Sequence, residues 1–285
     1  MCICVAFIAS ADNDTNLRKH EGHYYLISEI NNHANQEVML ESAIPGLLIG
    51  DSIFNYLFPE FDYSTARKME KAKIALHQNI YSIDYIFDKD IVVGNGTYTG
   101  KIFILKDYNG IALPLQNYTS NDNNNPFIYI NLQSGELKFT DYIDRNESKV
   151  QKFKYHIVDD LPVIQTNLNI KTDTISATIE SDFIIDFGNA SLLFLMKNNK
   201  VISEMLENSK LSLSVATNKE GKVVAEGLYA DELTIGDYTF SDVSVGVTTK
   251  LKSFDKFAGL IGLKFFQSPF IIDFMNHKLI LLPSN

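Results

Sequence analysis

Two acidic residues, Glu41 and Asp186, stand out because each ends an apolar run and opens a turn. Glu41 follows the letters VML in the first half of the chain, and Asp186 follows FII in the second half. Two carboxylates held close together cannot both ionise readily, so one keeps a proton and acts as an acid while its ionised partner acts as a base. The pair is a candidate site for acid–base chemistry, provided that the fold brings the two turns together.

The elements that must position these acids form an internal repeat. Three stretches of the first half return in outline and in the same order: residues 23–48 as 161–193, residues 90–105 as 232–247, and residues 126–139 as 269–281. Self-similarity on this scale indicates a duplicated domain. Two lobes related by pseudo-symmetry would bring both acids to the interface between them.

Composition predicts a mainly β protein with two cores. The 285 residues are 45% hydrophobic and 12% aromatic, which is enough for two cores of ordinary domain size. Ile, Val, Thr, Tyr and Phe occur in short runs separated by Asn, Asp and Gly, as is typical of strands and turns. Two segments predict helices, residues 63–78 and residues 200–209, and they occupy matching places after the two acidic turns.

The sequence around both acids resembles a known family. The segment FIIDFGNASLLFL is similar to the strand, turn and strand of aspartic peptidases, and VMLESAIPGLLIG aligns with it without a gap. The segment FAGLIGLKFFQSPFIIDFMNHKLILLP is similar to the end of such a lobe. The resemblance covers roughly residues 23–283 and is closest to retropepsin-like and pepsin-like peptidases, especially duplicated, secreted bacterial forms. It implies two pseudo-symmetric β-barrel lobes, an interlobe cleft that holds an extended polypeptide, and a catalytic pair formed by Glu41 and Asp186.

The supporting letters depart from the Asp-Thr-Gly motif of that family. The two turns read Glu41-Ser42-Ala43 and Asp186-Phe187-Gly188. The additional methylene of the glutamate moves its carboxylate, and a displacement near 1 Å can cost on the order of 100-fold in rate. The serine can supply one of the two hydroxyl groups that tie the turns together in the family, but the phenylalanine cannot supply the other. The glycine fits the third position, whereas the alanine is expected to crowd it.

A later departure affects the first lobe alone. The letters Leu260-Ile261-Gly262 match the family pattern, and Ala112-Leu113-Pro114 stand in their place in the first lobe, where proline removes an N–H donor. We therefore interpret the protein as binding an extended peptide with impaired or lost catalysis. Two alternatives stay open: an active aspartic endopeptidase that uses the Glu41/Asp186 pair, and a structural or interaction module without enzymatic activity.

Charge and rival motifs exclude other classes. The formal net charge of −10 and the absence of a basic cluster argue against nucleic-acid partners. DFG at 186–188 also occurs in protein kinases, but no His-Arg-Asp loop precedes it, and the glycines at 94, 96 and 100 predict a hairpin turn rather than a phosphate loop. HEGH at 20–23 lacks the spacing of a zinc site and predicts a solvated loop. No metal or cofactor is expected.

The expected organisation has four parts: residues 1–19 as a signal-peptide-like or disordered segment, 20–142 as the N-terminal lobe, 143–154 as a linker, and 155–285 as the C-terminal lobe. The first eleven residues, MCICVAFIASA, are apolar and end in the small residues that signal peptidase cleaves, which predicts a secreted or periplasmic protein. No run approaches the ~20 apolar residues of a membrane span. Two lobes in one chain predict a monomer.

Overall fold

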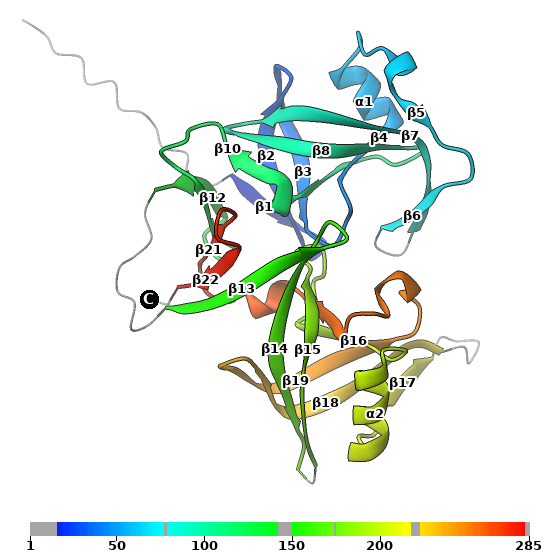
Figure 1. Ribbon diagram of the computed structural model, residues 1–285, viewed down its shortest axis with the longest axis vertical. Coiled ribbons are helices and arrows are strands. Elements are labelled where there is room, and N and C mark those ends of the chain that lie inside the picture. Colours follow the sequence, from blue (N-terminus) through cyan, green and yellow to red (C-terminus); the bar gives the residue numbers. More distant parts are fainter. Residues whose placement is uncertain (1–15, 77–78, 142–149, 174, 218–222, 283–285) are drawn as a thin grey trace, which may run out of the picture.

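The computed structural model describes residues 16–76, 79–141, 150–173, 175–217 and 223–282. It shows a mainly β protein with two lobes, one above the other in Figure 1, and this confirms the predicted fold class. Of the signal-peptide-like or disordered segment expected at residues 1–19, residues 1–15 lie outside the described residues. Within the part of the chain that the structure describes, none of the helices has the length and apolar character needed to span a membrane.

The first lobe contains a closed ring of six strands. Strands β2, β3, β9, β4, β8 and β7 pair in that order, and β7 pairs again with β2 through Val93 and Ile30. The strands of this lobe are β1 (Leu17–His20), β2 (His23–Ile30), β3 (His33–Glu41), β4 (Leu47–Gly50), β5 (Arg67–Lys68), β6 (Lys73–Leu76), β7 (Asn79–Val93), β8 (Gly96–Leu105), β9 (Ile111–Pro114) and β10 (Tyr118–Ser120).

The second lobe closes in the same way. Strands β14, β15, β20, β16, β19 and β18 pair in that order, and β18 returns to β14 through the pairs from Leu168 and Ile235 to Lys171 and Glu232. The strands of this lobe are β14 (Leu161–Lys171), β15 (Ser176–Ile185), β16 (Leu193–Met196), β17 (Ser214–Thr217), β18 (Val223–Ile235), β19 (Tyr238–Thr248) and β20 (Gly259–Ile261).

The strand pairing of the two rings agrees element for element. In both lobes the strand that carries the acid runs parallel to a short strand late in the lobe, β3 with β9 and β15 with β20. That short strand also pairs antiparallel with the strand after the acidic turn, β4 or β16. Strands β4 and β16 in turn run parallel to β8 and β19. The two acids therefore stand at equivalent places in two equivalent sheets.

A further sheet joins the lobes. Its strands are β12 (Glu136–Thr140), β11 (Phe127–Asn131), β21 (Phe270–Asp273), β22 (Lys278–Leu281) and β13 (Gln151–Val158), in that spatial order. Strand β11 of the first half pairs with β21 of the second half, and β13 continues into the second lobe by pairing with β14. This sheet lies beside the junction of the lobes in Figure 1. It fixes the relative position of the two acidic turns.

One of the two predicted helices is confirmed and the other is wrong. Helix α2 spans Lys200–Ser209, and Asn199 caps it by accepting hydrogen bonds from Val201 N and Ile202 N at 3.0 and 3.3 Å. Of the predicted residues 63–78, the described residues 63–76 instead form a 3-10 turn, η1 (Tyr63–Thr65), followed by β5 and β6, which pair with β7. Pairing with a long neighbouring strand overrides the local helical pattern.

The helix that matches α2 in the first lobe is α1 (Asp51–Leu57), directly after β4. It buries Phe54 and Leu57 against the ring. Three further 3-10 turns, η2 (Leu115–Asn117), η4 (Lys252–Phe254) and η5 (Leu263–Phe265), complete the helical elements of the described residues. The helices thus cover the ring, and the acidic turns come immediately before the strands that lead into them.

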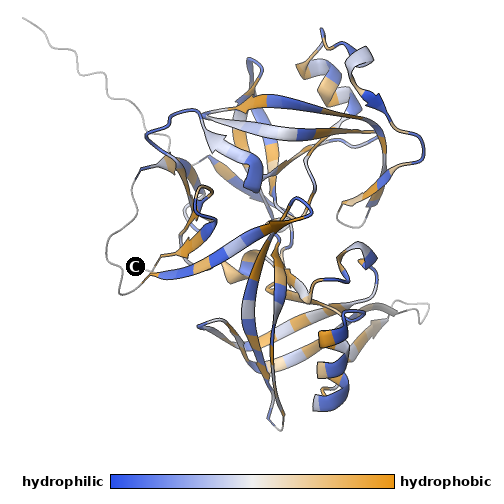
Figure 2. Ribbon diagram, in the orientation of Figure 1, coloured by the Kyte–Doolittle hydropathy of each residue, from blue (hydrophilic) through white to orange (hydrophobic). Residues whose placement is uncertain are grey.

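The apolar core runs through both lobes. Hydrophobic and hydrophilic residues alternate along the long strands, as Figure 2 shows, and the inward set forms one large cluster that contains residues from both halves. Two smaller clusters lie apart from it, one centred on Leu48 and Phe103 and the other on Val163 and Ile184. Each of these reaches the neighbourhood of the acids, as described below.

The domain boundaries stay a prediction, although two elements cross them. Strand β1 begins at Leu17, before the expected start of the first lobe at residue 20. Strand β13 begins at Gln151, inside the expected linker of residues 143–154, and pairs with β22. Residues 142–149 lie outside the described residues. The described residues at both expected boundaries therefore form sheet strands rather than connecting loops.

Candidate functional site

Glu41 and Asp186 reach the same place from equivalent strands. Glu41 is the last residue of β3 and lies opposite Pro114 of β9. Asp186 follows β15, and its N–H donates to Ile261 O of β20 at 2.8 Å. The sequence favours this exit because the apolar run before each acid forms a strand that is buried in the lobe, whereas the turn residues after it cannot continue the pairing.

The structure brings the two carboxyl groups together. They hydrogen bond to each other across the seam between the lobes. Glu41 is 4% exposed and Asp186 is 8% exposed, so both acids are buried. A Cβ built on Gly188 would fall on the carboxyl group of Glu41. The longer glutamate side chain therefore reaches across the seam and packs directly against the backbone of the second turn, which only glycine permits.

Burial governs the ionisation of both acids. Desolvation raises the pKa of Asp186 to about 7, against hydrogen bonds from backbone N–H groups and from Glu41 that lower it. Desolvation and the neighbouring charge of Asp186 raise the pKa of Glu41 well above its ordinary value. The pKa of both acids is therefore raised, and the pair keeps a proton at a higher pH than an exposed carboxyl group would.

Each carboxyl is also held by its own turn. The N–H of Gly188 donates to Asp186 Oδ1 at 3.0 Å, and the N–H of Ser42 donates to Glu41 Oε2 at 3.2 Å. The N–H of Ala43 also donates to Glu41. The expected crowding by Ala43 therefore does not keep its amide from the acid. Its methyl group instead packs against the second-lobe cluster that contains Leu161.

The side-chain hydroxyl of Ser42 links the first acidic turn to the second. Its Oγ donates to Ile185 O at 2.7 Å and accepts from Phe187 N at 2.9 Å, so a single hydroxyl of the first lobe satisfies both groups of the second. Phe187 makes no reciprocal bond of this kind. Its ring is 4% exposed and stacks on Phe270 and Phe266 with centroids 5.5 and 4.9 Å apart. The predicted loss of one hydroxyl is therefore accompanied by a gain in core packing.

A side-chain amide replaces backbone bonds near the first turn. In the second lobe Leu263 N donates to Asn189 O at 2.7 Å. In the first lobe a side-chain amide binds the equivalent carbonyl. Gln116 Nε2 donates hydrogen bonds to Ser42 O at 3.1 Å, to Ile44 O at 3.3 Å and to Asp160 O of the second lobe at 2.9 Å. Gln116 follows Pro114, the residue that departs from the family pattern. The sequence shows no signal for this role, because glutamine in a short turn is common.

Two further elements border the acids, and the sequence missed both. The β6–β7 hairpin contributes Leu76 and Tyr81 to the cluster that also contains Ile44 of the first turn and Tyr108. Tyr108 lies close enough to Glu41 for that charge to raise the pKa of its phenol, although burial is the larger cause. The described part of the hairpin therefore packs into the same apolar cluster as Ile44 of the first turn.

The prediction of a solvated loop around HEGH is wrong for its last residue. His23 begins β2, is half-buried, and forms a hydrogen bond with the backbone of Gly188. Burial lowers the pKa of this imidazole. The adjacent Gly22 touches Ala190, so the β1–β2 hairpin of the first lobe rests on the second acidic turn. Only the tertiary fold places this hairpin there.

The site offers acid–base chemistry without an evident place for a metal. Among the described residues, no cluster of three or more His, Cys, Asp or Glu side chains is placed to bind a metal ion. Two surface grooves, of about 870 and 610 Å³, lie elsewhere and include neither Glu41 nor Asp186 in their linings. What the arrangement can do is to share one proton between two buried carboxyl groups at the junction of two lobes.

Comparisons with known proteins add little to this geometry. No protein-family model and no curated protein matches the sequence. Among solved structures, conglutin gamma, a basic 7S globulin from lupine seeds, is similar over 94% of both chains with 8% identity and a TM-score of 0.49. Basic 7S globulin from soybean is similar over 91% of this chain and 92% of its own, with 8% identity and a TM-score of 0.47. These values are too low to support an argument, so the function must be inferred from the site.

Proposed function

We propose that this is an aspartic-peptidase-like protein that holds an extended polypeptide between its lobes, with Glu41 and Asp186 at the floor of the binding cleft and with impaired hydrolytic activity. The observation that carries the proposal is the pair of buried carboxyl groups, which come from equivalent turns and hydrogen bond to each other. The matching strand order of the lobes supports their origin by duplication, and the apolar N-terminal letters support export.

The surroundings of the acids favour a strand-like ligand with apolar side chains. One apolar cluster, with Met39 and Ile44, borders the first turn, and another, with Val163 and Phe257, borders the second. An extended chain places alternate side chains on opposite sides, so it can use both clusters at once while its backbone forms hydrogen bonds. Access to these clusters requires local movement, because the four residues are buried.

Three features account for impaired turnover. The carboxyl of Glu41 is pressed against Gly188, which restricts the space in which two acids would hold a water. Phe187 fills the core where a second cross-seam hydroxyl would stand in the family. Both acids are buried beneath neighbouring elements. Since catalysis depends on placing groups to within a fraction of an ångström, these changes lower the rate without abolishing binding.

An active aspartic endopeptidase is the second candidate. The pKa of each acid is raised by burial, so the pair keeps a proton above the ordinary range of carboxyl groups, and a carboxylate and a carboxylic acid can coexist as general acid–base hydrolysis requires. This candidate predicts turnover on the acidic side, where one proton is retained by the pair. Binding and turnover can be separated by experiment.

The decisive experiment uses the full chain with acid-denatured haemoglobin at pH 4 to 5. Cleavage that disappears in Asp186→Asn would identify an active enzyme. Slow or absent cleavage, together with binding of haemoglobin peptides that is lost in Ala43→Phe, supports the impaired binder. Ala34→Phe is the matched control, because it makes the same change at an exposed position of β3. If the protein shows neither cleavage nor peptide binding, both candidates are refuted and the structural module remains.

A pair of substitutions tests the account of impairment. Glu41→Asp with Ala43→Gly restores the family letters of the first turn and removes the contact with Gly188. We expect acid cleavage to rise by about 10- to 100-fold, the range that a displacement near 1 Å costs. Phe187 is left in place, because Thr at this position would create a cavity beside Phe270 and confound the result with lost stability. Unchanged cleavage in a folded variant would contradict the explanation.

A further inference from the structure

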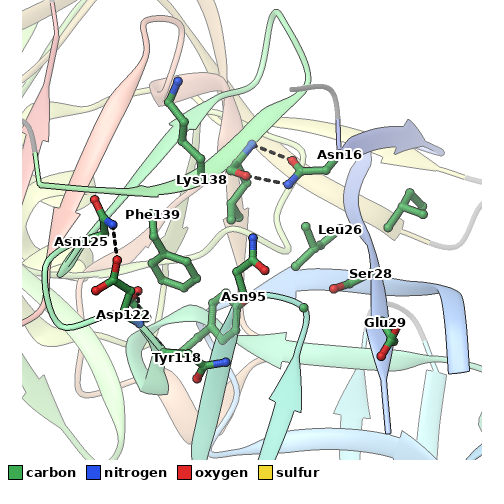
Figure 3. A pocket seen from close by; sticks show the side chains of 15 residues that line it. Asn16, Leu26, Ser28, Glu29, Asn95, Tyr118, Asp122, Asn125, Lys138 and Phe139 are labelled. Atoms are coloured by element: carbon green, nitrogen blue, oxygen red, sulfur yellow. Dashed lines mark hydrogen bonds between the residues drawn. The ribbon is translucent and has the colours of Figure 1, made fainter. Parts of the chain in front are cut away.

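An open groove of about 870 Å³ lies on the first lobe, away from the two acids. Figure 3 shows its main side chains, with Phe139 and Tyr118 at the centre, Leu26 and Ser28 on one wall, and Asn16 at one end. The groove runs along β12, which is the last strand of the twelve-stranded sheet. An edge strand exposes backbone groups that another strand can pair with.

The outward backbone groups of β12 face this groove. Asn16 Nδ2 donates to Leu137 O at 2.6 Å, and Leu137 N donates to Asn16 Oδ1 at 2.8 Å, as the dashed lines in Figure 3 mark. Because residues alternate in the direction of their hydrogen bonds along an antiparallel strand, the N–H and C=O of Phe139 turn to the same side. The groove therefore borders a strand position outside β12.

The second half of the protein shows what occupies the equivalent position. Leu17 N donates to Gly135 O at 2.9 Å at the start of β1, and Tyr155 N donates to His277 O at 2.9 Å at the equivalent place in β13. From there β13 extends back to Gln151 and pairs with β22 along its whole outer edge. In the second half, the space that corresponds to the groove is thus filled by a strand.

One aromatic residue of that strand covers a hairpin glycine. Phe153 lies opposite Leu279 and packs over Gly236, whose φ is +59°. Gly94 is the equivalent glycine in the first half, with φ +56°, and its N–H donates to Glu29 O as that of Gly236 donates to Asn167 O. Gly94 lines the groove, and Ser28 lies beside it as Thr166 lies beside Gly236, so the first half offers a comparable place for an aromatic side chain.

At Asn16 the backbone of the chain does not occupy the strand position outside β12. Leu137 of β12 corresponds in register to Leu279 of β22. The backbone of Leu279 lies opposite the main chain of Phe153. In the first half the side-chain amide of Asn16 stands there instead. The five residues before Asn16 read ADNDT and include no aromatic residue. An aromatic side chain from another molecule would complete the equivalence.

We propose that this groove binds an extended segment of a partner protein, added as a strand outside β12 with a large aromatic side chain over Gly94. Backbone bonds to Phe139 would supply part of the affinity, and further bonds to Leu137 form when Asn16 gives way. Glu29 and Asp122 line the groove together with a single lysine, Lys138, so the charged lining is negative on balance and favours basic residues beside the aromatic one. The segment of β13, with Lys152 and Lys154 around its phenylalanine, has this composition.

The experiment uses the full chain and a fluorescein-labelled peptide with the sequence of β13, QKFKYHIV. We expect saturable binding in an anisotropy titration. The control peptide QKAKYHIV is expected to bind roughly 10- to 100-fold more weakly, the factor that corresponds to burying one Phe side chain. Absence of binding at peptide concentrations near 1 mM, or equal binding of the two peptides, would overturn the proposal.

Two variants locate the binding site. Ser28→Trp fills the space above Gly94 and is expected to reduce binding at least tenfold, whereas Asn16→Ala removes the competing amide and is expected to tighten it. Peptide that binds equally well to wild type and to both variants would point to exchange with β13 in the second half and refute the assignment. Binding that appears only after residues 1–15 are deleted would also refute it, because the chain's own terminus would then be the occupant. Neither variant contacts the acids, so acid cleavage stays unchanged.

Discussion

The buried pair of acids makes the stability of this protein depend on pH in an unusual direction. Carboxyl groups that are stabilised in the ionised form lend stability as pH rises, but Asp186 has a raised pKa, about 7 against an ordinary 3.8. Its contribution is fully present below pH 3.8 and is lost as pH rises through 7, because the unfolded chain ionises first. We therefore expect the wild type to lose stability across this window.

The magnitude follows from the size of the shift. A rise of roughly three pKa units corresponds to roughly 4 kcal/mol, at about 1.4 kcal/mol per unit. Asp186→Asn removes this titration, so its free energy of unfolding relative to that of the wild type should increase by roughly this amount between pH 4 and pH 8. Glu41 also has a raised pKa, so the double variant with Glu41→Gln should show a still flatter profile.

Urea unfolding at several pH values, followed by circular dichroism, measures this difference. Asp107→Asn is the matched control, because it removes an exposed carboxylate at a left-handed position that asparagine also tolerates. If the difference between Asp186→Asn and the wild type is the same at pH 4.5 and at pH 8, the acids do not share a buried seam, and the reasoning on which the proposed function rests is refuted.

Three further substitutions test the contacts around the acids. Ser42→Ala leaves two buried backbone groups of the second turn without a partner and should lower stability by roughly 2–4 kcal/mol in urea unfolding, whereas Ser42→Thr, which keeps the hydroxyl, should retain most of it. Gly188→Ala places a methyl group on the carboxyl of Glu41 and should cost about 1–3 kcal/mol, and Glu41→Ala in the same chain should relieve most of this cost; additive effects would contradict the contact. Gln116→Leu removes the amide that joins both lobes and should lower the thermal midpoint, and an unchanged midpoint would show that the bridge contributes nothing.

Much of the site could be read from local sequence. An apolar run that ends in an acid and a turn specifies a buried strand with a carboxylate at its end, and the repeat specifies that this occurs twice. The same reasoning located helix α2 at its observed bounds, and the structure adds that Asn199 caps its N-terminus. It also anticipated that Ser42 alone would link the turns, since only one of the two positions carries a hydroxyl.

Prediction from local sequence failed for segments whose structure depends on contacts with distant parts of the chain. Residues 63–78 carry a helical pattern, yet β7 offers its unpaired edge, and β6 pairs with it from Lys73 to Leu76. The roles of Gln116 and His23 depend on the second lobe, which lies far away in the chain. A residue's partner across a seam cannot be inferred from its neighbours in sequence.

The sequence by itself determined the chemistry that is available: two carboxyl groups, one hydroxyl beside them, and two similar sets of strands to carry them. The tertiary structure alone decided that the Glu41 carboxyl lies on Gly188, that the β6–β7 hairpin packs into the cluster of the first turn, and that the edge of β12 borders a groove while that of β22 is filled. The physical reason is that burial and mutual distance, which set the proton affinity of the pair, exist only after the two lobes have packed.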